Sequence, residues 1–443
     1  MGDALSGFVD RALDADIALH TLQVSVDGEL AVTDGIAPFH VDEPHRLYSV
    51  SKSITGLAVL LLADEGALTL DDPVVDHFPE MPPVHPWLAE TRIDDMLAMT
   101  GPHSRTTYDA EGDGWLESYF RVPPTHRPGT FFTYDTSASY VLAALVERLS
   151  GGTVLDYLRP RVLEPLGVGA GARFLTGPEG YSHGGSGLMA APADLLPLAE
   201  VINGGGVRGG SRIVPEAVVR RLIERRSDPG MQTWGAPLRA GYGRQVWLPG
   251  GGAWLMFGLG GQLVYGDPAK KVAAVVTADA TALASGDQRL VDLLCEALGA
   301  ETPAPGAVLR APTRAHDAAY ARTRRGRYEV LTGEDAPTQL HVDLAADTGQ
   351  VRIGGEHVPY SVTAPVVAEL GLGRAVVTAG WSAPGVLELR VSAAADDIAS
   401  VRMRIVTHAD DLISVMSQGF GPAIGPAWTW RGTYRAAAAA SAP

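Results

Sequence analysis

A serine and a lysine three residues apart, Ser49 and Lys52, are the side chains of this sequence best suited to chemistry. Lysine is scarce: only three of the 35 basic residues are lysines, and the other two, Lys270 and Lys271, are adjacent. Lys52 directly precedes the apolar stretch 54–63. Arginine does not give up its proton under ordinary conditions, whereas a desolvated lysine does. The position therefore indicates a need for an amine that loses its proton.

The spacing of this pair predicts a nucleophile and its base. Residues three apart on a helix share one face, and the first turn offers unpaired N–H groups to developing negative charge. Burial disfavours a charged lysine, so a neutral Lys52 would accept the proton of Ser49. The alternative is a chance pattern, in which the serine caps a helix and the lysine is solvated. We interpret the neighbouring Ser51 and Ser53 as helix-start residues.

Composition limits the classes of function. The 443 residues suffice for two or three domains, and 46% hydrophobic with 19% charged residues is typical of a globular protein. A net charge of −16 argues against nucleic acid or an anionic membrane as a partner. The one cysteine, Cys295, excludes an intrachain disulfide and is expected in the core. The 12 histidines show no ligand spacing, so no metal is expected.

The cellular location is inferred from sorting and membrane-spanning signals. No basic stretch followed by an apolar segment marks a signal peptide at the N-terminus, and the longest apolar run is too short to span a bilayer. We therefore expect a cytoplasmic protein. The sequence does not define its oligomeric state.

The first 300 residues show helices at both ends and strands between them. We expect a helix over 6–20, a strand over Thr21–Val32 with a turn at Asp27-Gly28, and a helix from Ser49 to a C-cap at Gly66. The Pro-rich part at about 60–175 is typical of a helical subdomain. Further helices are predicted at Ala190–Asn203, Pro215–Arg225 and 285–299, and antiparallel strands at Gly241–Leu248, Trp254–Phe257, Leu263–Gly266 and Val272–Ala278.

The composition changes near residue 301. A Pro-rich linker is predicted at 301–316, because Glu301-Thr302-Pro303-Ala304-Pro305-Gly306 favours extended chain. Short alternating segments then indicate a small antiparallel β domain over 317–435, followed by an Ala-rich tail at 436–443 that we expect to be disordered.

Several ordered landmarks resemble the serine β-lactamase, penicillin-binding protein and family VIII carboxylesterase superfamily. They are Leu47-Tyr48-Ser49-Val50-Ser51-Lys52, Asp64-Glu65-Gly66-Ala67-Leu68, Pro128-Gly129-Thr130-Phe131-Phe132-Thr133-Tyr134 and Gly185-Ser186-Gly187-Leu188-Met189. The resemblance covers most of residues 20–300. It implies an α/β (α+β) β-lactamase-like catalytic domain, in which helices flank an antiparallel sheet, with a helical subdomain. The C-terminal β domain resembles the lipocalin-like appendages of some relatives.

The resemblance also assigns site residues. The second motif falls on Tyr134-Asp135-Thr136, which makes Tyr134 the partner base, as a phenolate beside Lys52, and places Thr136 where relatives have asparagine. The third motif falls on Met256-Phe257-Gly258, without the usual Lys or His, and the resemblance implies that these residues and Thr136 contact the substrate. Carboxylesterase members also carry an apolar residue there. Gly258 is expected where the strand backbone approaches the substrate.

The oxyanion hole implied by the resemblance consists of the backbone N–H groups of Ser49 and Leu259. Trp115 is a candidate for lining the substrate pocket, with packing as the alternative, and Tyr119 and His103 have the same two interpretations. No cofactor is implied. The glycines around Gly260 lack the Gly-Lys-Ser/Thr of a phosphate loop.

Together these features predict a serine hydrolase that forms an acyl-enzyme with a small ester or amide. The acyl group would pass to water, or to an amine or alcohol acceptor. One alternative is a β-lactamase or D,D-peptidase, which the missing third-motif cation disfavours. Another, from a different class, is a catalytically silent binding protein that keeps the fold.

Overall fold

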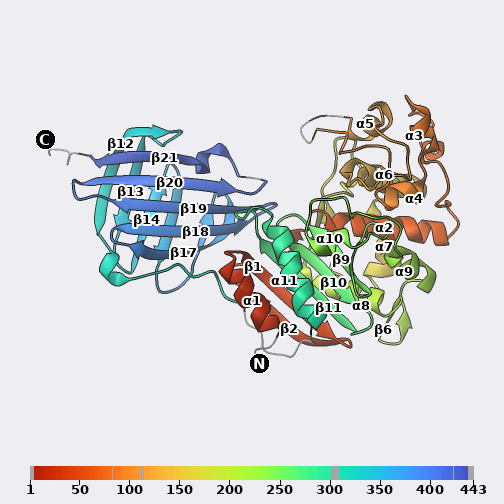
Figure 1. The fold of residues 1–443 in the computed structure, drawn as a ribbon, viewed down its shortest axis with the longest axis horizontal. Coiled ribbons are helices and arrows are strands. Elements are labelled where there is room, and N and C mark those ends of the chain that lie inside the picture. The colour runs from red at the N-terminus through yellow and green to blue at the C-terminus, as the bar shows by residue number, and fades with distance from the viewer. Residues whose placement is uncertain are drawn as a thin grey trace.

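The computed structural model describes residues 4–81, 83–109, 112, 114–300, 309–422 and 424–437. Figure 1 shows a central sheet with helices packed on it, a helical region to one side and a barrel-like β domain to the other. The predicted architecture, an α+β body with helices flanking an antiparallel sheet, followed by a small antiparallel β domain, is confirmed.

The central sheet has six antiparallel strands in the order β2-β1-β11-β10-β9-β8. Their bounds are β1 Ala18–Val26, β2 Glu29–Gly35, β8 Trp247–Gly250, β9 Ala253–Gly258, β10 Gln262–Asp267 and β11 Val272–Asp279. Every residue of β10 and β11 is buried. Burial on both faces explains why β11 is almost continuously apolar rather than alternating.

Helices cover both faces of this sheet. On one face α1 (Ala4–Asp14) and α11 (Gly286–Ala300) pack together and share one apolar cluster with the strands. On the other face α8 (Pro192–Asn203) and α2 (Val50–Asp64) belong to a second cluster, which continues into the helical region. The start of α2 therefore lies between the sheet and the helical region.

The helical region consists of short helices around the long helix α6 (Thr136–Ser150). Its other members are α3 Pro86–Glu90, α4 Ile93–Leu97, α5 Trp115–Arg121 and α7 Val154–Leu158, with 3-10 or π turns at Val74–His77 and Arg159–Leu163. Two more helices, α9 Glu216–Ile223 and α10 Ala236–Arg239, follow α8. Small strands complete this part: β3 His45–Arg46, β4 Arg173–Phe174, β5 Leu188–Ala190, β6 Val207–Arg208 and β7 Ser211–Arg212.

The C-terminal domain is a ten-stranded antiparallel sheet in the order β15-β14-β13-β12-β21-β20-β19-β18-β17-β16. Its end strands β15 and β16 contact each other, so the sheet curls into a barrel whose interior holds an apolar cluster that includes Trp381, Tyr360 and Tyr434. The strands are β12 Arg324–Glu334, β13 Gln339–Leu344, β14 Thr348–Ile353, β15 Glu356–Ser361, β16 Val366–Leu370, β17 Gly373–Ala383, β18 Val386–Ala394, β19 Ile398–Thr407, β20 Leu412–Phe420 and β21 Trp430–Ala436. Two 3-10 turns accompany them, Ala318–Tyr320 and Pro426–Trp428.

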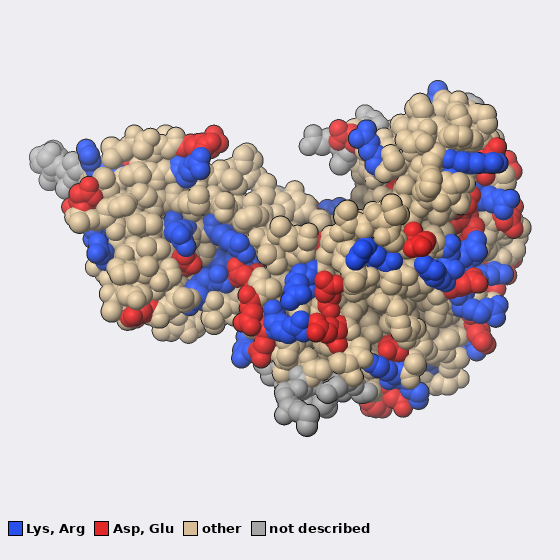
Figure 2. Space-filling view, in the orientation of Figure 1, with Lys and Arg blue, Asp and Glu red and all other residues tan. Residues whose placement is uncertain are grey.

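Charged contacts join the barrel to the α+β body formed by residues 4–300. Asp16, in the turn between α1 and β1, pairs with Arg314, Arg390 and Arg402. Burial by itself would raise the pKa of Asp16, but these arginines outweigh it and hold the pKa below its usual value. Between the barrel and the helical region the surface is hollowed, and charges of both signs are mixed over the face seen in Figure 2.

Element boundaries differ from expectation mainly at the N-terminus. The first helix ends at Asp14 rather than residue 20, and the next strand begins at Ala18, because Ala18 and Leu19 pair with β11 instead of continuing the helix. Pairing with β9 begins at Trp247, so most of Gly241–Leu248 is not strand. The predicted linker falls partly on 301–308 and the predicted tail mostly on 438–443, both outside the described residues.

Among the described residues no helix is both long and apolar enough to cross a bilayer. In the same residues no three His, Cys, Asp or Glu side chains are grouped as metal ligands. Cys295 is half-buried at the edge of the cluster formed by α1, α11 and the sheet.

Candidate active site

Ser49 occupies the N-cap position of α2 but does not cap the helix with its side chain. The interpretation of Ser49 as a mere helix cap therefore fails, because its hydroxyl is not used for that purpose. Ser51 and Ser53 are the structural serines instead: Ser51 Oγ donates to the Tyr48 carbonyl and Ser53 Oγ to the Gln245 carbonyl, each at 2.5 Å. Ser49 itself is half-buried at the helix start.

Lys52 points from the first turn of α2 back to Ser49. Its Nζ donates to Ser49 Oγ at 3.0 Å and to the Gly185 carbonyl at 2.6 Å. The side chain is only 1% exposed, because α2 is buried along almost its whole length. Burial lowers the pKa of Lys52 to about 7, although the charge of Asp135 acts to raise it. A substantial fraction of the amine is therefore neutral near pH 7.

Tyr134 completes the cluster, with its ring centroid 4.8 Å from Lys52 Nζ. Burial raises the pKa of the Tyr134 hydroxyl above its usual value, and a hydrogen bond with Ser49 only partly opposes this. Burial therefore favours the neutral phenol, whereas the role as partner base expected for Tyr134 needs the phenolate. Of Ser49, Lys52 and Tyr134, Lys52 is the residue whose neutral, proton-accepting form is present near pH 7.

Asp135 is a site residue that the sequence interpretation passed over. It is 3% exposed and caps α6 by accepting from the Ser137 N–H at 2.8 Å. Burial raises the pKa of Asp135 to about 6, against the opposing effects of Ser137 and of Lys52. The neighbouring Thr136 does not reach the proton relay: its methyl group packs against Gly185, whose carbonyl accepts from Lys52.

The residues of the third motif serve packing in the structure. Met256 is 1% exposed and lies in the apolar cluster shared by α2 and the sheet. Met256, expected from the third motif to contact the substrate, thus packs in the core in this structure. At Gly258 a Cβ would lie 2.3 Å from the carbonyl oxygen of Leu47, two residues before Ser49. Glycine is required there because β9 passes directly against the turn that carries the serine.

This close approach brings the turn after β9 next to Ser49. Leu259, the first residue of that turn, is 44% exposed. The fully buried Gln262 fixes the turn by donating from Nε2 to the carbonyl oxygens of Leu259, at 3.1 Å, and Ala278, at 2.7 Å. His45 and Gln262 are joined by a hydrogen bond of 2.9 Å between Nε2 and Oε1. The sequence showed Gln262 only as a residue after two glycines and gave no signal of this role.

An aromatic wall extends the site on the sheet side. The Tyr134 ring stacks on Trp247 at 5.5 Å and meets Trp234 edge-on at 5.4 Å. Phe257 belongs to the same apolar cluster and, like Tyr134 and Trp234, is half-buried. The rings of Tyr134 and Trp234 thus form an apolar surface beside Ser49, with which the Tyr134 hydroxyl is hydrogen-bonded. Trp234 and Trp247 come from segments that no motif marked.

Trp115 lies in a second aromatic group within the helical region. Its ring stacks on Tyr108 at 4.2 Å and contacts His183 edge-on at 4.9 Å, and the indole N–H donates to the Asp109 carbonyl. At 8% exposure it mainly packs. His183 links this group to the site, because burial and then the nearby charge of Lys52 lower the pKa of His183 to about 3. His103 and Tyr119 are buried packing residues, in edge-on contact at 4.9 Å.

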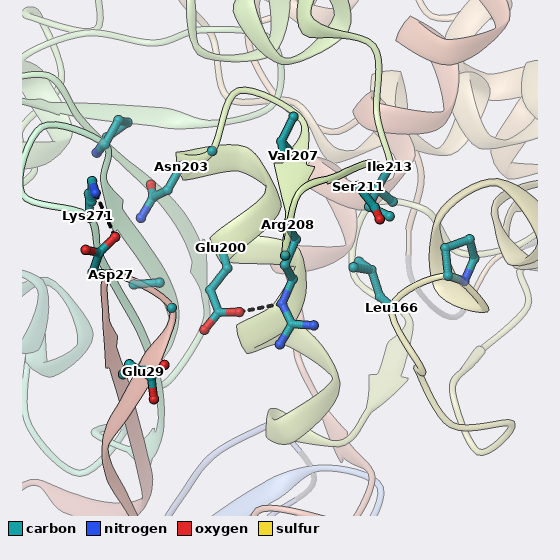
Figure 3. Close-up of a pocket in the computed structure, with 16 residues that line it drawn as sticks. Asp27, Glu29, Leu166, Glu200, Asn203, Val207, Arg208, Ser211, Ile213 and Lys271 are labelled. Atoms are coloured by element: carbon teal, nitrogen blue, oxygen red, sulfur yellow. Dashed lines mark hydrogen bonds and ion pairs between the residues drawn. The ribbon is translucent and has the colours of Figure 1, made fainter.

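A separate pocket of about 660 Å³ lies at the other end of the sheet (Figure 3). Four of its charged side chains form pairs: Lys271 with Asp27 at 2.7 Å, and Arg208 with Glu200 at 2.5 Å. Asn203, also in its wall, donates to the Val272 carbonyl and accepts from the Trp254 indole. These groups are already satisfied within the protein, in contrast to the cluster around Ser49.

Comparison with known proteins agrees with this geometry. Residues 11–295 match the model of the Beta-lactamase family. A 6-aminohexanoate-dimer hydrolase of Paenarthrobacter ureafaciens is 27% identical over 255 residues, 52% of this chain and 65% of that protein. A lovastatin esterase of Penicillium rubens is 27% identical over 237 residues, 46% of this chain and 57% of that protein.

Among solved structures, the octameric penicillin-binding protein homologue from Pyrococcus abyssi is similar over 97% of this chain and 99% of its own, with a TM-score of 0.52 and 16% identity. That similarity extends through the barrel and concerns the fold. The match over residues 11–295 covers more than half of the chain and contains the Ser49 and Lys52 pair. The protein belongs to the beta-lactamase family and is a serine hydrolase of this superfamily.

Proposed function

We propose that the protein takes an acyl group from a small ester or amide onto Ser49 and passes it to water, or to an amine or alcohol. One observation carries this proposal: Lys52 Nζ lies 3.0 Å from Ser49 Oγ, and no carboxylate of the described residues forms an ion pair with it. Burial lowers the pKa of Lys52 to about 7, so the amine is available as a base. A buried ammonium with a direct carboxylate partner would stay charged.

The proposed acylation begins when Ser49 gives its proton to neutral Lys52 while Oγ forms a bond to the substrate carbonyl carbon. The carbonyl oxygen becomes an oxyanion, which the N–H groups of Ser49 and Leu259 stabilise. The proton then passes through the Tyr134 hydroxyl to the leaving alcohol or amine as its bond to carbon breaks. In the second half the acceptor gives its proton to the same relay while its oxygen or nitrogen forms a bond to the acyl carbon. The bond between that carbon and Ser49 Oγ then breaks, and the relay returns the proton to Oγ.

The surroundings favour a substrate with an apolar portion. The half-buried rings of Tyr134, Trp234 and Phe257 offer contact area rather than charge. Arg46, the cation just before Ser49 in sequence, is already paired with Asp397. A carboxylate on the substrate, as in a β-lactam, would have to compete with Asp397 for that cation. We therefore favour an esterase or amidase activity over the β-lactamase or D,D-peptidase alternative.

The decisive experiment is intact-mass detection of an adduct with a fluorophosphonate and with a p-nitrophenyl ester, for the wild-type protein and Ser49→Ala. We expect one adduct per chain in the wild type and none in the variant. Absence of an adduct in the wild type would favour the silent binder. Turnover of a chromogenic β-lactam comparable to that of the ester would favour the β-lactamase alternative.

A second measurement separates hydrolysis from transfer. The ester is supplied with a series of amines and alcohols at fixed concentration, and the products are resolved by mass. Aminolysis or alcoholysis products, absent in Ser49→Ala, would show transfer from the same acyl-enzyme. Free acid alone at every acceptor concentration would restrict the function to hydrolysis.

A further inference from the structure

The turn that carries Ser49 is held by a residue of the barrel. Asp397 lies in the loop between β18 and β19, and its Oδ1 accepts from the Tyr48 hydroxyl at 2.9 Å. The same hydroxyl accepts from the N–H of Ile398 at 3.0 Å. The carboxylate of Asp397 also pairs with Arg46, whose guanidinium lies over the Tyr48 ring at 4.9 Å. The barrel therefore contacts the residue directly before the nucleophile.

Tyr48 adopts a backbone conformation that needs such support. Its φ of +45° lies in the left-handed region, which is costly for a bulky residue and persists only where the surroundings enforce it. Tyr48 is 3% exposed, and its carbonyl accepts from Ser51 Oγ. The backbone is thus fixed from α2, and the side chain from the barrel. This conformation determines the direction in which the Ser49 N–H and hydroxyl point.

The same barrel loop contacts the turn after β9. The Cδ1 atom of Ile398 fills the space beside Gly260, since a Cβ on Gly260 would lie 2.1 Å from it. Gly260 follows Leu259 and has a φ of +76°. Consecutive residues of the barrel therefore touch the two turns whose N–H groups form the proposed oxyanion hole. In Figure 1 the ends of β18 and β19 reach toward the catalytic body.

We propose that Asp397 and Ile398 are positioning residues for catalysis, through which the barrel sets the relative placement of the two oxyanion donors. This inference rests on the proposed function, in which Ser49 and Leu259 bind the oxyanion. Its consequence is specific: loosening the contact lowers the rate of acylation more than it weakens ground-state binding, because oxyanion donors act mainly on the transition state.

The test compares Asp397→Ala, Asp397→Asn and Tyr48→Phe in the full-length protein. For Asp397→Ala we expect kcat for the p-nitrophenyl ester to fall about 10- to 100-fold with KM changed less than about threefold, less than the 10²–10³ lost when an oxyanion donor is removed outright. Tyr48→Phe preserves shape, so its kcat is expected to fall about tenfold, less than the roughly 10²-fold that a misplacement of about 1 Å costs. Asp397→Asn keeps an acceptor for the Tyr48 hydroxyl, so its kcat should lie between those of Asp397→Ala and wild type.

The matched control is Glu43→Gln. Glu43 pairs with Arg374 of the barrel at 2.7 Å, so this change also removes a charged contact between the two domains, but away from the serine turn. Its kcat should equal that of wild type. If it falls as far as Asp397→Ala, the barrel acts through general docking and the inference is overturned. It is also overturned if Asp397→Ala and Tyr48→Phe both retain wild-type kcat.

The double variant Tyr48→Phe with Asp397→Ala separates positioning from loss of stability. If the two residues act through one contact, the double variant should be no slower than Asp397→Ala alone. Losses that multiply, together with a lower melting temperature in each variant, would indicate a structural role only. Adduct formation by the wild-type protein is measured first. If no adduct forms, the proposed function fails before any variant is compared.

Discussion

The regions around Lys52 and Lys271 show what a protein does with the same side chain in two settings. Lys271 is 64% exposed and pairs with Asp27 beside the remote pocket (Figure 3). Lys52 is 1% exposed, and among the described residues it forms no carboxylate ion pair. The exposed amine remains hydrated and paired, whereas the buried one is destabilised in its charged form. The reactivity that we propose for Lys52 therefore follows from burial without a direct carboxylate partner.

Lys270, the third lysine, shows yet another use. Its Nζ donates to the carbonyl oxygens of Leu298 and Gly299, near the C-terminal end of α11. A cation there is stabilised by the unpaired carbonyls and the negative end of the helix dipole. Lys52 occupies a different setting, in which burial lowers the pKa of the amine to about 7.

The contrast between Lys52 and Lys271 is tested most directly by replacing each lysine with arginine. We expect Lys52→Arg to reduce kcat/KM by about 10³-fold or more, because the guanidinium keeps its proton and cannot accept that of Ser49. Lys271→Arg keeps a cation beside Asp27 and should leave the rate unchanged. Steady-state kinetics with a p-nitrophenyl ester checks both. Near-normal activity of Lys52→Arg would exclude the general-base role.

A smaller loss is expected at the proton relay. Tyr134→Phe removes the hydroxyl but keeps the ring that packs on Trp247, so kcat should fall by about 10²-fold while the fold is retained. The loss should be larger for esters with poor leaving groups, because they need a proton most. The measurement is kcat against leaving-group pKa. Equal losses along the series would argue against proton delivery by Tyr134.

The pH dependence sharpens the comparison further. Since Lys52 acts in its neutral form and its pKa is about 7, kcat/KM should rise as pH increases through 7 and level off above it. The carboxylate of Asp135 raises the pKa of Lys52, so Asp135→Asn should move this rising limb to lower pH. Asparagine keeps the cap on α6. A limb that stays in place or moves to higher pH would contradict the coupling.

The smallest effects are expected at the remote pocket. Glu200→Gln weakens the pairing with Arg208 and should change stability by about 1 kcal/mol or less, without altering kcat/KM. Thermal unfolding and ester turnover measure the two quantities. A loss of turnover here would show that the pocket is coupled to the site around Ser49.

The sequence by itself determined the chemistry. Ser49 and Lys52 lie on one helix three residues apart, so local geometry alone sets their contact, and the scarcity of lysine marked the pair. The motif around Tyr134 and the antiparallel strands after residue 250 were also recognisable, since both depend on short-range patterns.

Tertiary structure decided which neighbours tune that chemistry. Met256 faces the core rather than the substrate, because strand alternation and packing under α2 fix its direction. Asp135 and Gln262 matter through contacts with residues distant in sequence. The contact of Asp397 with Tyr48 joins residues 349 positions apart, and only the folding of the barrel against the catalytic body creates it. Spacing predicts contacts within a helix, whereas contacts between domains depend on how whole surfaces pack.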